Sequence, residues 1–261
     1  MQKPNLLCRN QKILSVLALL VTLAVLRYVD RSLFTAAVLL PLWFIIYRPW
    51  SRVEIVSFTI AAVFMLIQDY AMGRSGGSSF KQQDVLLMPW YEPFLWGFYY
   101  INMKRFIGEG DNGAVLDRRS LFGLLVTALV FPLFSWSYGL LLLTTIGSTA
   151  ILFIMFHDLL DLYFAAYALG LGFVVELFGV SSGLWSYPPQ PEFMGIPYWC
   201  ATMWLSGGIL GRRFLFPLAG WIDGMLMHAK PVPEALNPRM DHGSQPWRDV
   251  KNEEMDRDKG S

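Results

Sequence analysis

Charged side chains are scarce in this chain. Asp, Glu, Lys and Arg make up 16% of its 261 residues, whereas 54% are hydrophobic and the mean hydropathy is +0.41. Soluble domains have about a quarter of their residues charged, so this composition excludes an ordinary soluble protein. The formal net charge of +1 also provides no basic surface for nucleic acid. The composition therefore predicts a membrane domain.

Cysteine and histidine are equally few. The two cysteines, Cys8 and Cys200, do not form a disulfide framework. Three histidines are too few for the histidine-rich di-iron sites of membrane desaturases. The chain also lacks a phosphate-binding P-loop, a Gly-x-Ser-x-Gly elbow, a His-Glu-x-x-His zinc motif and paired Asp-rich magnesium motifs. We therefore expect no cofactor.

Long apolar runs make up most of the chain, and a membrane-crossing helix needs about 20 such residues. Eight runs predict an all-α, polytopic transmembrane bundle. Seven spans are the alternative, because the apolar stretch 120–156 is divided only at Pro132 and at residues 135–137. The predicted spans are Lys12–Arg27, Arg31–Tyr47, Val53–Met72, Val85–Ile107, Ser120–Trp136, Tyr138–Phe156, Leu159–Val180 and Phe193–Gly211.

The transmembrane helical domain is predicted to comprise residues 1–229. Its last segment, 214–228, is apolar but contains Pro217 and Asp223, so it either extends the eighth span or lies along the membrane surface. Residues 230–261 are rich in Pro, Asp, Lys, Arg and Asn and are predicted to form a disordered cytoplasmic tail.

Three acidic residues lie in the outer half of the predicted spans, and charged groups inside a membrane mark functional sites. Asp69 is expected about one turn inside the outer end of the third span, Glu92 about 10 Å inside the fourth, and Glu176 about 6 Å from the end of the seventh. All three are candidate catalytic residues in the outer half of the membrane. The alternative is that each is hydrated at an interface or paired with a loop arginine.

Aromatic residues are dense around the same ends. Belts of Trp and Tyr at membrane surfaces account for many of them. Next to the acids they also suit an apolar pocket whose ring faces stabilise a developing carbocation. The candidate substrate-binding residues are Trp90, Tyr91, Trp96, Trp185, Tyr187 and Trp204.

A second polar group lies between the sixth and seventh spans. On a continuous helix, His157 and Asp161 would share a face, as a pair of metal ligands does. The interpretation we favour is a polar turn in which an aspartate caps the seventh helix, with no metal bound.

The segment Glu176-Leu-Phe-Gly-Val-Ser-Ser-Gly-Leu-Trp-Ser-Tyr187, followed by Met194-Gly-Ile-Pro197 and Trp204, resembles the core motif of the carotenoid-biosynthesis membrane protein family. Characterised members are cofactor-free hydratases of terminal isoprenoid double bonds. The resemblance is limited to residues 176–204, with Ser182 in place of the usual Thr. It implies matching positions at Glu176, Gly179, Gly183, Tyr187, Gly195, Pro197 and Trp204.

The leading functional hypothesis is an intramembrane enzyme, a cofactor-free hydratase or isomerase acting on an apolar lipid such as an isoprenoid. Glu176 would donate the proton, because removal from water favours the protonated form of a carboxyl group. Glu92 would orient water or accept the second proton, and Asp69 would assist. The alternatives are a proton-coupled transporter or lipid-handling protein, and a structural or assembly subunit. The sequence does not predict an oligomeric state.

The topology follows from the distribution of Lys and Arg, which favour cytoplasmic loops. Eight spans with both termini cytoplasmic, in a bacterial inner membrane or its equivalent, place most basic residues inside. A reporter fused after Ser261 is therefore expected to be cytoplasmic, and one inserted near Gly76 external. An external C-terminal reporter would contradict the eight-span prediction.

Overall fold

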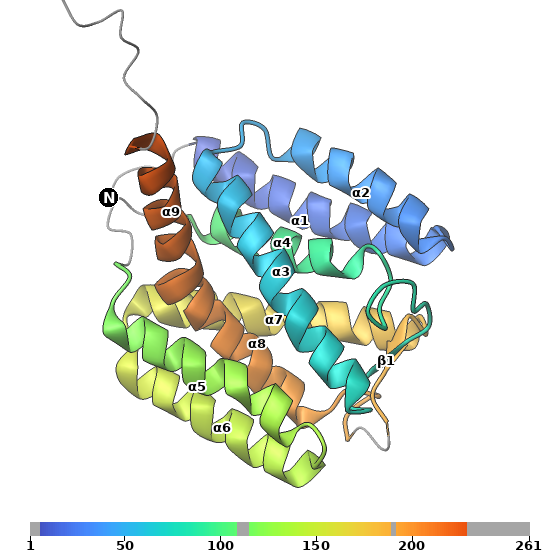
Figure 1. Ribbon diagram of the computed structural model, residues 1–261. Helices are drawn as coiled ribbons and strands as arrows, with labels where there is room; N and C mark the ends of the chain where they lie inside the picture. The colour runs from blue at the N-terminus through green and yellow to red at the C-terminus, as the bar shows by residue number, and fades with distance from the viewer. Residues whose placement is uncertain (1–5, 109–114, 189–191, 229–261) are drawn as a thin grey trace, which may run out of the picture. The chain divides into compact units, whose positions relative to one another are not determined.

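The computed structural model describes residues 6–108, 115–188 and 192–228, so the predicted tail lies outside the described residues. This part of the chain is mostly helical (Figure 1). A π-helical turn, η1 (Gly211–Leu215), joins the last two α-helices without a break. The α-helices are α1 (Leu6–Tyr28), α2 (Ser32–Ile46), α3 (Arg52–Arg74), α4 (Glu92–Ile107), α5 (Arg118–Phe134), α6 (Tyr138–Met155), α7 (Leu159–Ser181), α8 (Tyr198–Leu210) and α9 (Phe216–His228).

The expected all-α, multi-span membrane fold is confirmed. Four of the described helices are long and apolar enough to cross a membrane: most of α1, and the whole of α3, α6 and α7. Large apolar side chains remain exposed, such as Ile154 at 77% and Ile67 at 58%, as expected where lipid replaces water. The protein is therefore a multi-pass integral membrane protein.

The helix boundaries agree with most of the predicted spans. Each predicted span corresponds to one described helix, and residues 135–137 separate α5 from α6 as expected. The segment 214–228 continues the last helix through η1 and α9. Of the two alternatives for this segment, the helix extension is the one observed.

The fourth and eighth spans were predicted to begin too early. The eighth was expected from Phe193, but α8 begins at Tyr198, directly after Pro197.

In the predicted fourth span, residues 85–91 fold as a turn, and α4 begins only at Glu92. Pro89 disfavours helical backbone at Met88, the residue before it. Pro93 lies in the first turn of α4, where no backbone donor is needed. Glu92 is therefore at the start of a helix and not about 10 Å inside one.

The compact unit that ends at Met225 is built from packed helix pairs. The closest pairs are α3 with α4, α7 with α8, and α5 with α6, while α1 packs on α4 and α6 packs on α8. Two short strands, β1 (Ser79–Phe80) and β2 (Trp185–Ser186), pair antiparallel and join the loops that follow α3 and α7 (Figure 1). We call the end of the bundle that carries them the strand end.

Polar side chains tie the helices together inside the bundle. Asn102 of α4 is fully buried; its amide donates to the carbonyl of Ser15 and to the hydroxyl of Tyr47, both at 2.8 Å, and its Oδ1 accepts from Tyr167 at 2.5 Å. These bonds link α4 to α1, to the end of α2 and to α7. Polar groups removed from water need such partners, because an unpaired buried donor or acceptor is costly.

The approach of α7 to α8 depends on Gly208. A Cβ at this position would lie 2.5 Å from the carbonyl oxygen of Phe164, and a backbone atom cannot give way as a flexible side chain can. The Gly208→Ala substitution is therefore expected to lower the free energy of unfolding by about 1–3 kcal/mol. Thermal unfolding of the purified protein in detergent measures this loss.

Gly147 of α6 is the matched control, since a Cβ there would meet nothing within 4 Å. The Gly147→Ala substitution is expected to leave stability unchanged, or to raise it by up to about 1 kcal/mol. Equal losses at both glycines would show that the cost does not come from the contact between α7 and α8.

Candidate functional site

The three acidic residues that the sequence marks line one cavity. Asp69 comes from α3, Glu92 from the first turn of α4 and Glu176 from α7. The cavity has a volume of about 40 Å³, which is enough for at least one water molecule. Among the described residues that line it there is no lysine, arginine or histidine. The cavity is therefore acidic, and no cationic side chain of the described lining balances its charge.

Glu176 is held by three hydrogen bonds. Its Oε2 accepts from the indole N–H of Trp185 at 3.0 Å and from the hydroxyl of Tyr187 at 2.7 Å, and its Oε1 accepts from the indole N–H of Trp204 at 3.2 Å. Burial raises the pKa of the Tyr187 hydroxyl well above its usual range, so this group stays a neutral donor. Three donors directed at one carboxyl group favour its ionised form and so oppose the effect of its burial, which favours the protonated form.

Two glycines of α7 make room for the indole rings. A Cβ on Gly179 would lie 1.9 Å from the ring of Trp185, and a Cβ on Gly172 would lie 2.2 Å from the ring of Trp204. Each ring thus lies directly on the backbone of the helix that carries Glu176. The pairing of β1 with β2 then holds Trp185 in place.

Asp69 and the indole of Trp96 form a second hydrogen-bonded pair at 2.7 Å. The ring of Trp96 also stacks on that of Trp204, with centroids 4.9 Å apart and an interplanar angle of 27°. The two indoles therefore join the Asp69 side of the cavity to the Glu176 side, and both rings line the cavity.

Glu92 differs from the other two acids. It is 6% exposed, and its Oε2 is buried with no hydrogen-bond partner among the described residues. Tyr99 also lines the cavity. Its hydroxyl is buried and, like the Glu92 oxygen, has no hydrogen-bond partner among the described residues. Three ionised carboxylates without a cation would repel one another strongly in this environment. The cavity must therefore hold at least one proton or a bound cation.

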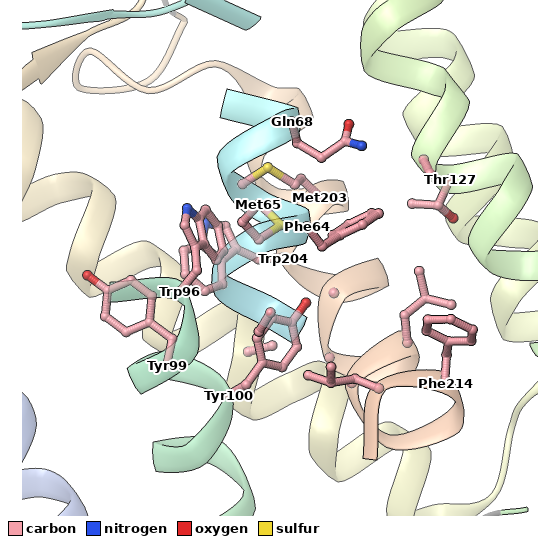
Figure 2. A pocket seen from close by; sticks show the side chains of 18 of the residues that line it. Phe64, Met65, Gln68, Trp96, Tyr99, Tyr100, Thr127, Met203, Trp204 and Phe214 are labelled. Atoms are coloured by element: carbon pink, nitrogen blue, oxygen red, sulfur yellow. The ribbon is translucent and has the colours of Figure 1, made fainter. Parts of the chain in front are cut away.

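A larger, apolar cavity adjoins the acidic one (Figure 2). It has a volume of about 110 Å³ and lies among α3, α4, α5, α7 and the α8–η1 segment. Asp69, Trp96 and Trp204 line both cavities. On α3 the lining runs from Met72 to Ile60, about 18 Å along the helix axis. The combination suits a ligand with an apolar body and a reactive or polar part at the acids.

The predicted aromatic residues divide into two groups. Trp96, Trp185, Tyr187 and Trp204 line the acidic cavity. Trp90 and Tyr91 are not among the described residues that line either cavity. They lie in the turn before α4, where a helix was predicted.

The second polar group, at the start of α7, is an ion-pair cluster. Asp161 is fully buried and accepts hydrogen bonds from Arg212, and from Arg213 at 2.6 and 2.8 Å. Asp158 is the N-cap of α7, as predicted, and His157 is exposed outside the helix. No group of three or more metal-ligand side chains occurs among the described residues. The carboxylate of Asp161 is thus used in ion pairs.

Several residues of the two cavities were not predicted. Tyr99 lines both, and Gln68 and Tyr100 line the apolar one. A signal for part of this set exists, because Trp96, Tyr99, Tyr100 and Met103 follow the spacing of one helix face. The spacing alone does not distinguish a cavity wall from ordinary core packing.

Comparison with known proteins gives a structural match without a sequence match. No protein-family model and no curated protein matches the chain. Two crystal structures of MvINS, an Insig homologue from Mycobacterium vanbaalenii, are similar, one of them a cross-linked trimer. Each has a TM-score of 0.56 and 19% sequence identity, over 66% of this chain and 96% of that chain. The protein is thus a helical membrane protein, and the matched part of it has the fold of an Insig homologue.

The hydrogen bonds of Glu176 lead to a stability prediction. In Glu176→Gln the side-chain NH₂ cannot accept, so at least one indole or phenol donor faces another donor. We expect the free energy of unfolding to fall by about 1–3 kcal/mol. Tyr187→Phe removes one donor without creating such a clash, so its loss is expected to be smaller. Thermal unfolding in detergent compares the two, and a Gln variant as stable as wild type would contradict the three-donor arrangement.

Proposed function

We propose that this protein is an intramembrane enzyme that protonates a carbon–carbon double bond of an apolar lipid, leading to hydration or isomerisation. The observation that carries the proposal is the convergence of three carboxyl groups on a cavity next to an apolar one, with no basic side chain among the described residues of its lining. Protonation of an alkene needs an acid shielded from bulk water and an apolar space for the chain. This site offers both.

The hydrogen bonds favour a division of roles among the acids. Glu176, with three donors, is the fixed carboxylate. Glu92, with an unpartnered buried oxygen, is the carboxyl group that holds the transferable proton. This assignment exchanges the roles that the sequence suggested for the two residues. Asp69, paired with Trp96, is the third acid of the cavity.

The reaction follows from these roles. The O–H bond of Glu92 breaks as its proton bonds to one alkene carbon, and the π electrons form the new C–H bond. The neighbouring carbon becomes a carbocation, facing carboxylates and the stacked rings of Trp96 and Trp204. In hydration a water oxygen bonds to that carbon and its proton goes to Glu176. In isomerisation Glu176 takes a proton from an adjacent carbon. Return of the proton to Glu92 completes either cycle.

The resemblance to the carotenoid-biosynthesis membrane protein family supports hydration of an isoprenoid in particular. Three of the matching positions are joined by hydrogen bonds, because Tyr187 and Trp204 both donate to the carboxyl group of Glu176. A fourth, Gly179, makes room for Trp185, which donates to the same carboxylate. The short motif thus coincides with the hydrogen-bonded part of the site.

A lipid-handling protein without catalysis is the second candidate. The apolar cavity favours it, because such a cavity suits a carrier or sensor of lipids as well as an enzyme. The two candidates differ in one measurable respect. Only the enzyme forms a new carbon–hydrogen bond with a proton from solvent.

Solvent deuterium tests this proposal. Membranes containing the protein are incubated in D₂O with an apolar lipid extract from cells that lack the gene, and the products are returned to H₂O before mass spectrometry. We expect a new species with one non-exchangeable deuterium, either an isomer or a product with the elements of water added. Absence of any labelled species with wild-type protein would favour the lipid-handling candidate.

Two variants assign the chemistry to the cavity. Glu92→Gln is expected to lower the rate at least about 100-fold, because an amide cannot deliver the proton. It should remain folded, since no hydrogen bond to its Oε2 is lost. Asp223→Asn, an acid of α9 that lines neither cavity, is the matched control and should keep the wild-type rate. Full activity in Glu92→Gln would remove Glu92 from the mechanism.

A further inference from the structure

The apolar cavity contains polar groups that the protein itself does not satisfy. Gln68 of α3 is 9% exposed, and its Oε1 is buried without a hydrogen-bond partner among the described residues. The side chain lines the apolar cavity and faces α5 across it (Figure 2). Buried polar groups are nearly always paired, so an unpaired amide oxygen at a cavity wall indicates a missing partner.

Two hydroxyl groups share the same cavity. The hydroxyl of Thr127 on α5 is buried and unpartnered in the described part of the chain. The hydroxyl of Tyr100 on α4 points toward the middle of the cavity (Figure 2), into space left by the missing side chain of Gly207. A Cβ on Gly207 would lie 3.3 Å from this hydroxyl oxygen. The acceptor of Gln68 and the donors of Tyr100 and Thr127 thus belong to one largely apolar space.

We infer that the apolar cavity binds a lipid that carries a hydroxyl group, and that this group binds at Gln68. An alcohol supplies both functions that the wall lacks. Its O–H donates to the Gln68 oxygen, and its oxygen accepts from Tyr100 or Thr127. A pure hydrocarbon would leave the Gln68 oxygen and the Thr127 hydroxyl without a partner among the described residues, so the site discriminates against it.

The hydroxyl-binding subsite at Gln68 is separate from Glu92, the residue proposed to transfer the proton. Gln68 lines the apolar cavity only, whereas Glu92 lines the acidic cavity only. The inference rests on the lipid-binding part of the proposed function and does not require catalysis. Binding and deuterium incorporation can therefore fail independently.

The test uses the purified full-length protein in detergent and two probes of the same carbon skeleton, the alcohol farnesol and the hydrocarbon farnesene. Radiolabelled farnesol binding is measured by scintillation proximity, with farnesene as competitor. Wild-type protein is expected to bind farnesol at least about tenfold more tightly than farnesene, since one satisfied hydrogen bond has roughly that effect.

Gln68→Leu keeps the size of the side chain and removes the amide. We expect it to bind both probes with similar affinity, near that of farnesene for wild type, which would also show that the cavity is intact. Tyr100→Phe and Thr127→Val should each reduce the preference in part. Glu92→Gln should keep the full preference even though its catalysis is lost.

Three results would overturn the inference: equal affinity of wild type for the two probes, an unchanged preference for farnesol in Gln68→Leu, or no binding of farnesol up to its solubility limit. If the preference for the alcohol holds while no deuterium is incorporated, the subsite stands and the protein is a lipid-handling protein. If deuterium is incorporated without a preference, the catalytic proposal stands and the subsite is rejected.

Discussion

The bilayer offers no water to the polar groups inside this bundle, so each must find its partner within the protein. Most of them do. Asn102 joins four segments of the chain, and Asp161 binds two arginines of η1. Glu54 pairs with Arg105 through two hydrogen bonds of 2.5 and 2.7 Å, which ties α3 to α4. These pairs determine which helices lie together, and hence where the two cavities form.

Six buried side-chain oxygens have no partner in the described part of the chain, and four of them lie around the cavities, whereas those of Ser15 and Tyr138 do not. Unpartnered oxygens of Glu92, Tyr99, Gln68 and Thr127 all lie on their walls. Such groups reduce stability, because each has lost its hydrogen bonds to water without replacing them. Several unpartnered groups in adjoining cavities lower stability but leave hydrogen-bonding groups free to bind a ligand. The rest of the bundle supplies the stability that this requires.

The sequence predicted the local features well and the long-range ones poorly. Apolar length determines where helices run, so five of the eight spans were placed within two residues of the observed helix ends. The first helix starts six residues earlier than predicted, and the eighth starts five residues later and extends further. The fourth failed at its start because Pro89 acts through backbone sterics, which hydropathy does not report. The acids were marked by their rarity in a membrane, yet their convergence depends on the adjacency of α3, α4 and α7. Likewise, the ion pair between Arg212 and Asp161 joins residues 51 positions apart, so no local sequence pattern indicates it.

The contact of Gly179 with Trp185 has a consequence for related chains. The indole occupies the place where any other residue at 179 would carry its Cβ, at 1.9 Å. A larger residue at that position would expel the ring and remove one donor from Glu176. A smaller residue at 185 would leave an empty space beside the helix. The two positions are therefore bound to vary jointly in evolution, as are Gly172 and Trp204, and a homologue that retains one member of a pair without the other has lost this form of the site.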